Sequence, residues 1–202
     1  MFPKIQSFIA NKVIPGIDGI PDDRKEMLQK LTEYIKASDE PVNLTFICSH
    51  NSRRSHLSQI WAQVAATYFN LPHVHTFSGG TEVTSFNHRA VATIARTGFL
   101  ISMDDNDDNN PIYHLRFSDE GDPMKCFSKL YNDDSNPTKG FAAIMTCSDA
   151  EQNCPFIPGT SARISLPYED PKEADNTPKE KERYSERSLQ IAVEMFYVFS
   201  QV

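Results

Sequence analysis

The sequence predicts an α/β protein of three layers, in which a small parallel sheet of about four strands lies between helices. Segments of strand-forming residues alternate along the chain with segments whose apolar residues recur at helical spacing. Such alternation is typical of parallel sheets that are covered on both faces. A length of 202 residues allows a substantial core in one domain with an appendage. We therefore expect a three-layer α/β/α architecture.

Four segments have the composition of buried strands. They are rich in apolar and β-branched residues and are bounded by polar residues, proline or glycine. The second is expected to stop before the pair Gly79-Gly80, because glycine weakens a strand. In chain order, the predicted strands are Leu44–Ile47, Val74–Ser78, Phe141–Thr146 and Arg163–Leu166.

Four further segments have the apolar periodicity of helices that pack one face on a core. Either Asp22 or Asp23 is expected to cap the first of them, and Gly98 is expected to close the third. In chain order, the predicted helices are Asp22–Ala37, Ser55–Phe69, Asn87–Thr97 and Glu180–Phe199.

Two regions fall outside this alternating pattern. We expect residues 1–40 to form an N-terminal helical extension and residues 41–202 to form the main domain. Within that domain, residues from about 104 to 140 have the character of an insertion. An acidic, asparagine-rich loop comes first, and "PIYHLRFSDEGDPMKCFSKLY" then predicts a hairpin that turns near Gly121.

Charge and cysteine content narrow the class of protein. The formal net charge is −7, so we expect no nucleic-acid or membrane partner, since both select a basic face. No apolar run is long enough to span a bilayer. The start, "MFPKIQSFIANKVIPG", is a poor signal-peptide core because Gln6, Asn11 and Lys12 interrupt it. Four cysteines are too few for a disulfide scaffold, so we expect a cytoplasmic, reduced protein whose cysteines are buried, metal-binding or reactive.

A thiol stands where the first predicted strand ends, and two arginines stand where the next helix begins. Open parallel sheets bind ligands at this edge. Backbone N–H groups of the loop from Ser49 to Arg53 can converge on an oxyanion, and the same field favours a thiolate at Cys48. Arg54 can hold two oxygens of a tetrahedral anion, and Ser55 can donate its hydroxyl to the thiolate. The alternative is a small buried cysteine beside a solvated pair of arginines.

The segment "CSHNSRRS" resembles the phosphate-binding loop C-x-x-N-x-x-R-S of the low-molecular-weight protein tyrosine phosphatase superfamily. The resemblance extends to "FSGGTE", after the second strand, and to "YEDP", which is similar to the late Asp-Pro loop of the family. It implies Cys48 as nucleophile, Arg54 as oxyanion clamp and Asp170 as general acid. Asn51 would hold the loop through a left-handed backbone, and Ser55 would stabilise the thiolate. The implied anion-binding loop comprises Ser49, His50, Asn51, Ser52, Arg53 and Ser55.

A second pair of cysteines, Cys147 and Cys154, lies in "IMTCSDAEQNCPFIP". The spacing is unusual for zinc ligands and no companion pair exists, which leaves two unrelated buried cysteines or a redox pair. The segment resembles that of the thioredoxin-coupled arsenate reductases, which have the phosphatase fold. Ordinary phosphatases of the superfamily lack the pair. The resemblance implies arsenate as substrate, a disulfide relay through both cysteines, and thioredoxin as reductant.

Two functional classes follow from these motifs. One is a thiol-based arsenate reductase, in which Cys48 attacks arsenic, Cys147 attacks Cys48 as arsenite leaves, and Cys154 resolves the disulfide. The other is a phosphatase that hydrolyses phosphomonoesters through a phosphocysteine at Cys48. A non-catalytic anion-binding module is disfavoured, because nucleophile, clamp and acid are all present.

The chain departs from the family pattern at three places. Arg53 stands where these reductases often carry cysteine, and it is expected to alter anion preference. Gln59 stands where some reductases have a glutamate that helps to hold a potassium ion; apart from that ion, the resemblance implies no bound cofactor. No tyrosine follows Asp170 and Pro171, unlike in the usual phosphotyrosine phosphatases.

The remaining candidates carry little chemistry. His50 either lines the anion site or shapes the loop, and Cys126 is expected to be structural because it has no spacing partner. His73 and His75 lack an adjacent third ligand, so we expect core or surface histidines and no metal site. The acidic stretch Asp104–Asp108 lacks the glycine and glutamate of an EF-hand, so we expect a solvated loop.

Overall fold

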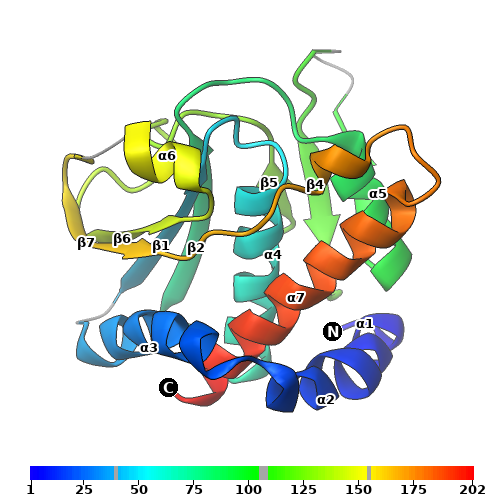
Figure 1. The fold of residues 1–202 in the computed structure, drawn as a ribbon, viewed down its shortest axis with the longest axis horizontal. Helices are drawn as coiled ribbons and strands as arrows, with labels where there is room; N and C mark the ends of the chain where they lie inside the picture. The colour runs from blue at the N-terminus through cyan, green and yellow to red at the C-terminus, as the bar shows by residue number, and fades with distance from the viewer. Residues whose placement is uncertain (39–40, 105–108, 154–155) are drawn as a thin grey trace.

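The centre of the molecule is a parallel sheet of four strands in the order β2-β1-β6-β7 (Figure 1). The computed structural model describes residues 1–38, 41–104, 109–153 and 156–202. The strands are β1 (Val42–Cys48), β2 (Val74–Gly80), β6 (Phe141–Met145) and β7 (Thr160–Ser165). The predicted small parallel sheet is confirmed.

The four predicted helices are present within one or two residues of their expected bounds. They are α3 (Asp22–Ala37), α4 (Arg54–Tyr68), α5 (His88–Thr97) and α7 (Glu180–Ser200). A short helix that was not predicted, α6 (Ser148–Asn153), follows β6. Six residues are too few to display an apolar period, so the sequence pattern could not reveal it.

The predicted C-terminal glycine of α5 is present, whereas the predicted N-terminal cap of α3 is not. Gly98 closes α5 in the left-handed region, with a φ of 114°. The predicted cap of α3 is wrong: Pro21 is the capping residue, and no side chain caps the helix. Asp22 and Asp23 lie instead in the first turn, where their carboxylates interact favourably with the helix dipole.

The two faces of the central sheet are covered differently. Leu44 and Phe46 of β1 belong to the main hydrophobic core, which they share with α3, α4 and α7. The opposite face of the sheet carries a smaller cluster that includes Ile47, Cys48 and Cys147, and α6 covers it (Figure 1). This smaller cluster brings two cysteines from different strand ends into one part of the fold.

The N-terminal residues form a chain of short helical turns that pack on α7 (Figure 1). Ile5, Ile9 and Val13 are fully buried and belong to the main core. The turns are α1 (Pro3–Phe8), the π-helix η1 (Ile9–Val13), α2 (Ile14–Gly16) and the 3-10 helix η2 (Ile17–Gly19).

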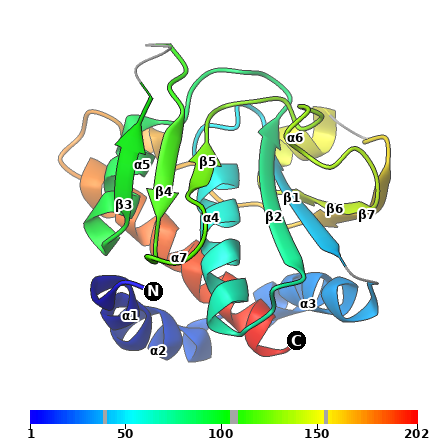
Figure 2. The ribbon, with the colours of Figure 1, turned by 180° about the vertical axis from the view of Figure 1, so that it is seen from behind.

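The inserted hairpin is part of a second, antiparallel sheet in the order β3-β4-β5 (Figure 2). Its strands are β3 (Leu100–Met103), β4 (Tyr113–Arg116) and β5 (Met124–Cys126). The turn near Gly121 is as predicted, and this glycine has a φ of 79°. The strand β3 was missed, because its four residues alternate poorly and are mostly exposed.

The predicted end of the second strand at Ser78 is wrong, because β2 runs through both glycines. Gly79 and Gly80 pair with Ile47 and Cys48 of β1. These glycines allow other backbone segments to approach the sheet: a Cβ on Gly79 would lie 2.3 Å from Cα of Tyr131, and a Cβ on Gly80 would lie 2.7 Å from the backbone N of Asn51. Close approach, and not strand termination, is the reason for the glycine pair.

Gly79→Ala is therefore expected to destabilise the fold by about 1–3 kcal/mol, since the added methyl group meets backbone atoms that cannot rotate away. Gly19→Ala is the matched control, because a Cβ at Gly19 would meet no atom within 4 Å. Urea unfolding of both variants measures the effect. Equal midpoints for the two variants would contradict this account of Gly79.

Candidate active site

The predicted anion loop lies at the carboxyl edge of the central sheet, between β1 and α4 (Figure 1). Cys48 is the last residue of β1, and Arg54 is the first residue of α4. Asn51 has a φ of 44°, in the left-handed region that asparagine tolerates better than most residues. This single backbone reversal turns the chain from the strand end into the helix start.

The carbonyl groups of this loop are engaged by residues outside it. Ser49 O accepts from the backbone N–H groups of Thr81 and Glu82, at 2.8 and 2.9 Å. Ser52 O accepts from the backbone N–H of Asn87, at 2.9 Å. Within the described part of the chain, no acceptor is recorded for the backbone N–H groups of residues 49–53. Backbone donors that have no partner in the protein can bind an oxyanion when they converge on one point.

A further support of the loop comes from the insertion. Ser128 Oγ donates to His50 O at 2.8 Å, and the backbone N–H of Lys129 donates to Asn51 Oδ1 at 3.0 Å. Gly80 N donates in turn to Lys129 O at 2.8 Å. Sequence reasoning missed Ser128 and Lys129, because no spacing along the chain relates them to the loop.

Cys48, Ser55 and Asn51 form a buried hydrogen-bonded chain. Cys48 Sγ lies 3.1 Å from Ser55 Oγ, and Asn51 Nδ2 donates to the same Ser55 Oγ at 2.9 Å. Because the amide uses a lone pair of the hydroxyl, the hydroxyl hydrogen is available to the sulfur. A serine so oriented stabilises a thiolate.

His56 is the next residue in this hydrogen-bonded chain, after Asn51. Its Nδ1 lies 3.4 Å from Asn51 Nδ2, and its ring stacks on Phe86 at a centroid distance of 4.1 Å. Burial lowers the pKa of His56 well below its ordinary value, and the charge of Lys129 lowers it further. A neutral imidazole can accept at Nδ1, which is consistent with its place beside an amide donor.

Arg54 and Asp170 are brought within hydrogen-bonding distance of each other. Arg54 Nη2 donates to Asp170 Oδ2 at 2.9 Å, and Nη1 donates to Tyr168 O at 2.9 Å. Asp170 is also the cap of the 3-10 helix η3 (Pro171–Ala174), where its Oδ1 accepts from the backbone N–H of Lys172 at 3.0 Å. A cavity of about 900 Å³ opens beside Arg54 and Asp170.

The side chain of Arg53 reaches the segment that carries Asp170. Its Nε donates to Tyr184 Oη at 2.8 Å, and its Nη2 lies 3.5 Å from Asp175 Oδ2. Burial raises the pKa of Tyr184 to about 12, so its hydroxyl keeps its proton and donates to Asp175 Oδ1 at 2.8 Å. Arg53 thus holds the Asp170 segment in place, a role that the sequence did not reveal.

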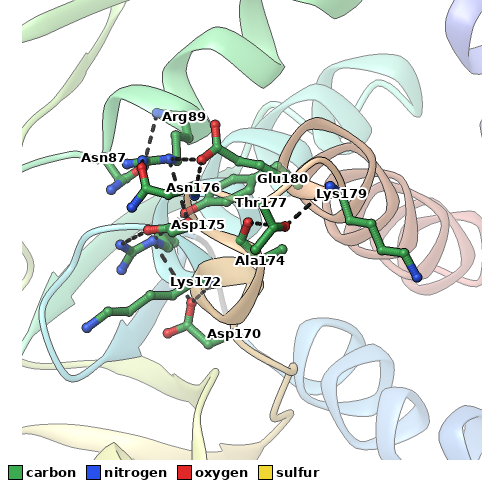
Figure 3. A network of polar contacts seen from close by, with 12 residues as sticks. Asn87, Arg89, Asp170, Lys172, Ala174, Asp175, Asn176, Thr177, Lys179 and Glu180 are labelled. Carbon is green, nitrogen blue, oxygen red and sulfur yellow. Dashed lines mark hydrogen bonds and ion pairs between the residues drawn. The ribbon is translucent and has the colours of Figure 1, made fainter.

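Arg89 extends this network on the far side of the same segment (Figure 3). It pairs with Glu180 at 2.7 Å and with Asp175 at 3.7 Å, and its Nη2 donates to Asn176 Oδ1 at 2.9 Å. Asn176 has a φ of 61°. Two arginines from different elements therefore fix the loop that presents Asp170 to the anion site.

Cys147 lies at the same edge of the sheet, two residues after the end of β6, and is fully buried. Its Sγ lies 3.6 Å from Ser49 Oγ, and it accepts from the backbone N–H of Ala150 at 3.3 Å. The structure thus places Cys147 beside the residue that follows Cys48. Cys154, the other predicted member of the pair, lies outside the described residues.

The remaining candidates lie as follows. His50 is half-exposed and its Nε2 is 3.3 Å from Glu82 Oε2, whereas Cys126 is fully buried and burial raises its pKa to about 12. Asp104 pairs with His114 at 3.0 Å, and residues 105–108 of the acidic stretch lie outside the described residues. Where side chains are described, no three of His, Cys, Asp or Glu are grouped to hold a metal ion.

The potassium ion that the resemblance implies near Gln59 stays a prediction. Gln59 Nε2 donates to Thr76 O at 3.1 Å, so the amide presents a donor to the strand. The ammonium group of Lys129 belongs to a residue that lines the same cavity as Gln59. The oxygen of the amide, Gln59 Oε1, is buried and accepts no hydrogen bond from the described residues.

Comparison with curated proteins identifies arsenate reductases as relatives in sequence. Arsenate reductase of Staphylococcus aureus (strain Newman) is 29% identical over 129 residues, which cover 62% of this chain and 76% of that protein. Arsenate reductase of Bacillus licheniformis is 27% identical over 143 residues, which cover 70% of this chain and 83% of that protein. No protein-family model matches the chain.

Comparison with solved structures identifies the fold. A low-molecular-weight phosphotyrosine phosphatase from Vibrio cholerae O395 superimposes with a TM-score of 0.52 and 12% identity, covering 79% of this chain and 95% of that chain. No helix in the described ranges is long and apolar enough to cross a membrane. The expected class, an enzyme of the arsenate reductase or phosphatase kind, agrees with the names of these proteins. The chain therefore has the fold of the low-molecular-weight phosphotyrosine phosphatases and is similar in sequence to arsenate reductases, as its motifs predicted.

Proposed function

We propose that this chain reduces arsenate to arsenite through its own cysteines, with thioredoxin as the final reductant. The observation that carries the proposal is a second buried thiol at the anion loop. Cys147 Sγ lies 3.6 Å from the hydroxyl of Ser49, the residue after Cys48. Hydrolysis of a phosphomonoester needs one nucleophilic thiol, whereas reduction needs a second thiol that can reach the first.

Arsenate binding would use the backbone N–H groups of residues 49–53, whose carbonyl groups are held from outside the loop. Arg54 would turn from Asp170 and Tyr168 to the anion, because a guanidinium can grip two oxygens at once. This movement would also release the carboxyl group of Asp170 for proton transfer. Arg53 and Arg89 would keep the Asp170 segment in place meanwhile.

The first chemical step joins sulfur to arsenic. The thiolate of Cys48 attacks arsenic(V), a sulfur–arsenic bond forms, and one arsenate oxygen leaves as water after Asp170 has given it a proton. Ser55, 3.1 Å from Cys48 Sγ, stabilises the thiolate before the attack. No change of oxidation state occurs in this step.

The second step carries the redox change. The thiolate of Cys147 attacks Cys48 Sγ, a Cys48–Cys147 disulfide forms, and the electron pair of the sulfur–arsenic bond stays on arsenic, which leaves as arsenite. Cys154 then attacks Cys147 Sγ, so that Cys48 departs as a thiolate and a Cys147–Cys154 disulfide remains. Thioredoxin supplies the two electrons that reduce this disulfide. Because the cycle depends on a reduced thioredoxin pool, we infer a cytoplasmic location.

The relay requires α6 to move, because Cys147, the residue that precedes α6 in the chain, is fully buried. The helix has six residues, and Glu151 holds it to β7 through Ser165, whose hydroxyl donates to Glu151 Oε2 at 2.6 Å. Arg163 lies 3.9 Å from Glu151 Oε1. A short helix held by few contacts opens locally at low free energy.

The decisive assay is arsenate-dependent oxidation of NADPH in the presence of thioredoxin and thioredoxin reductase. We expect consumption that stops when arsenate is replaced by phosphate, because phosphate cannot accept the electron pair. If the chain hydrolyses an aryl phosphate but consumes no NADPH with arsenate, the reductase proposal fails and the phosphatase is correct.

The alternative function is hydrolysis of phosphomonoesters through a phosphocysteine at Cys48. The polar cavity of about 900 Å³ beside Arg54 favours it, because inorganic arsenate needs far less room. The same loop, clamp and acid would serve, and water would take the place of Cys147 as the second nucleophile.

Asp170→Asn is expected to slow reactions with poor leaving groups by about 10²–10⁴-fold and reactions with activated aryl phosphates much less. Only poor leaving groups need a proton in the transition state. Rates for a series of phenyl phosphates with leaving groups of different basicity measure this. An equal loss across the series would mean that Asp170 acts only through its contact with Arg54.

A further inference from the structure

A second cavity, of about 590 Å³, lies between the inserted hairpin and the layer formed by α4 and β2. Figure 2 shows β5 next to α4, with β2 on one side of this pair and β4 on the other. None of the residues that line this cavity belongs to the anion loop. Its volume is within the range of sites that hold small organic molecules.

The polar feature of this cavity is the buried ammonium group of Lys129. The residue is 5% exposed and lines the cavity, and its Nζ lies 4.5 Å from the ring centroid of Phe127. Among the described residues, none is recorded as accepting a hydrogen bond from this ammonium group or lying within ion-pair distance of it. Burial lowers the pKa of Lys129, although the charge of Asp133 raises this pKa and so opposes the effect of burial. A cation held in this way is stabilised when an anion enters beside it.

Two amide side chains in the wall of the cavity have buried oxygens without a donor. Gln59 and Asn136 both line it, and the buried atoms Gln59 Oε1 and Asn136 Oδ1 accept no hydrogen bond in the described part of the chain. Their amide nitrogens are engaged, since Gln59 Nε2 donates to Thr76 O and Asn136 Nδ2 donates to Ser78 O. Flipping either amide would break these bonds. Both oxygens are inaccessible from outside, so the two amides form a polar part of the wall and offer no acceptor to an occupant.

We propose that this cavity binds a small organic carboxylate that has an apolar ring. The carboxylate would pair with the ammonium group of Lys129. The ring would pack among Phe77, Phe117 and Phe127, which also line the cavity. A carboxylate fits better than a phosphate, because one ammonium group balances one negative charge and Glu120 and Asp122 at the rim repel a dianion.

The occupant would lie against the residue that supports the anion loop. The backbone N–H of Lys129 donates to Asn51 Oδ1 at 3.0 Å, and its carbonyl accepts from Gly80 N at 2.8 Å. The side chain of Lys129 thus lines the cavity, while its backbone supports the anion loop by hydrogen bonds. This inference does not depend on whether the loop reduces arsenate or hydrolyses phosphomonoesters.

The test is titration calorimetry with benzoate, phenylacetate, indole-3-acetate and N-acetyl-L-phenylalanine, each compared with its own neutral amide. We expect at least one acid to bind about tenfold or more tightly than its amide, because only the acid forms a charge-assisted bond with Lys129. Saturating inorganic phosphate should not displace it, since phosphate occupies the anion loop. The comparison of acid and amide needs no variant protein.

Lys129→Met is expected to weaken binding of that acid by a similar factor, whereas Lys139→Met, which alters an exposed lysine, should leave it unchanged. Circular dichroism and the melting temperature establish that both variants fold. Binding of no acid, equal binding of acid and amide, displacement by phosphate, or unchanged binding to folded Lys129→Met would each overturn the proposal. If Lys129→Met does not fold, the acid–amide pair decides alone.

Discussion

Arg54→Lys is expected to lower kcat/KM by about 10²–10³-fold, with arsenate as well as with an aryl phosphate. In the structure, Arg54 already donates from two nitrogens at once, to Tyr168 O and to Asp170 Oδ2. The reacting arsenate or phosphoryl group requires the same pair of hydrogen bonds from one guanidinium in the transition state. A lysine ammonium group at this position carries the charge but not the planar pair of donors.

The measurement is steady-state kinetics with both substrates, together with the binding of inorganic phosphate to the resting protein. Arg116→Lys is a suitable control, because Arg116 lies in the inserted hairpin and donates to Gly121 O. Folding of both variants is verified by their melting temperatures. A rate for Arg54→Lys within about threefold of the parent, for both substrates, would show that another group holds the anion.

The central sheet could be predicted because its signals are local. Strands such as Leu44–Ile47 are buried on both faces, so they form continuous apolar runs, and the main helices repeat apolar residues every three or four positions. Where this local signal is weak, prediction fails. The short helix α6 and the exposed strand β3 have too few residues to show a period.

The prediction that the glycine pair ends the second strand failed for a different reason. Gly79 and Gly80 were expected to end the second strand, yet both continue it, because the backbone segments at Tyr131 and Asn51 approach where a side chain would stand. In the sequence, a glycine pair that ends a strand looks the same as a glycine pair that lets another backbone segment approach the strand closely. Only the tertiary contact distinguishes the two, and the tertiary contact has no signature in the local sequence.

In the anion loop, too, the contiguous motif could be recognised in the sequence, whereas the contacts made by remote residues could not. Its motif is contiguous, so Cys48, Asn51 and Ser55 could be assigned together from "CSHNSRRS". The groups that hold it open come from remote segments: Thr81 and Ser128 lie 32 and 78 residues from the loop residues that they contact. No spacing rule could find them.

The two arginines of the motif also differ in a way that the sequence does not express. Both arginines lie within ion-pair distance of Asp170, Arg54 Nη2 at 2.9 Å and Arg53 Nε at 4.0 Å, but Arg53 also contacts Tyr184 and Asp175. Arg53 thus joins the segment that carries Asp170 to Tyr184 of α7. Two identical letters side by side do not express this difference.

The cysteine relay gives the second large expected effect. Cys154→Ser is expected to complete about one turnover with arsenate and then stop as a Cys48–Cys147 disulfide, because no thiol remains to resolve it. Cys147→Ser is expected to stop earlier, at the sulfur–arsenic adduct. Its hydroxyl can still accept the hydrogen bond that Ala150 N gives to Cys147 Sγ at 3.3 Å, so the fold should be retained.

Peptide mapping of the stalled proteins, without reductant, identifies the bonded cysteines. Cys126→Ala is the control: Cys126 is fully buried and its pKa is raised to about 12, so it should take no part and this variant should behave like the parent. Both relay variants should still hydrolyse aryl phosphates, since that reaction needs only Cys48, Arg54 and Asp170. Repeated turnover of arsenate by Cys154→Ser would exclude the relay. The absence of a Cys48–Cys147 disulfide in that variant after exposure to arsenate would exclude it equally, because the nearness of Cys147 to the loop would then have no chemical consequence.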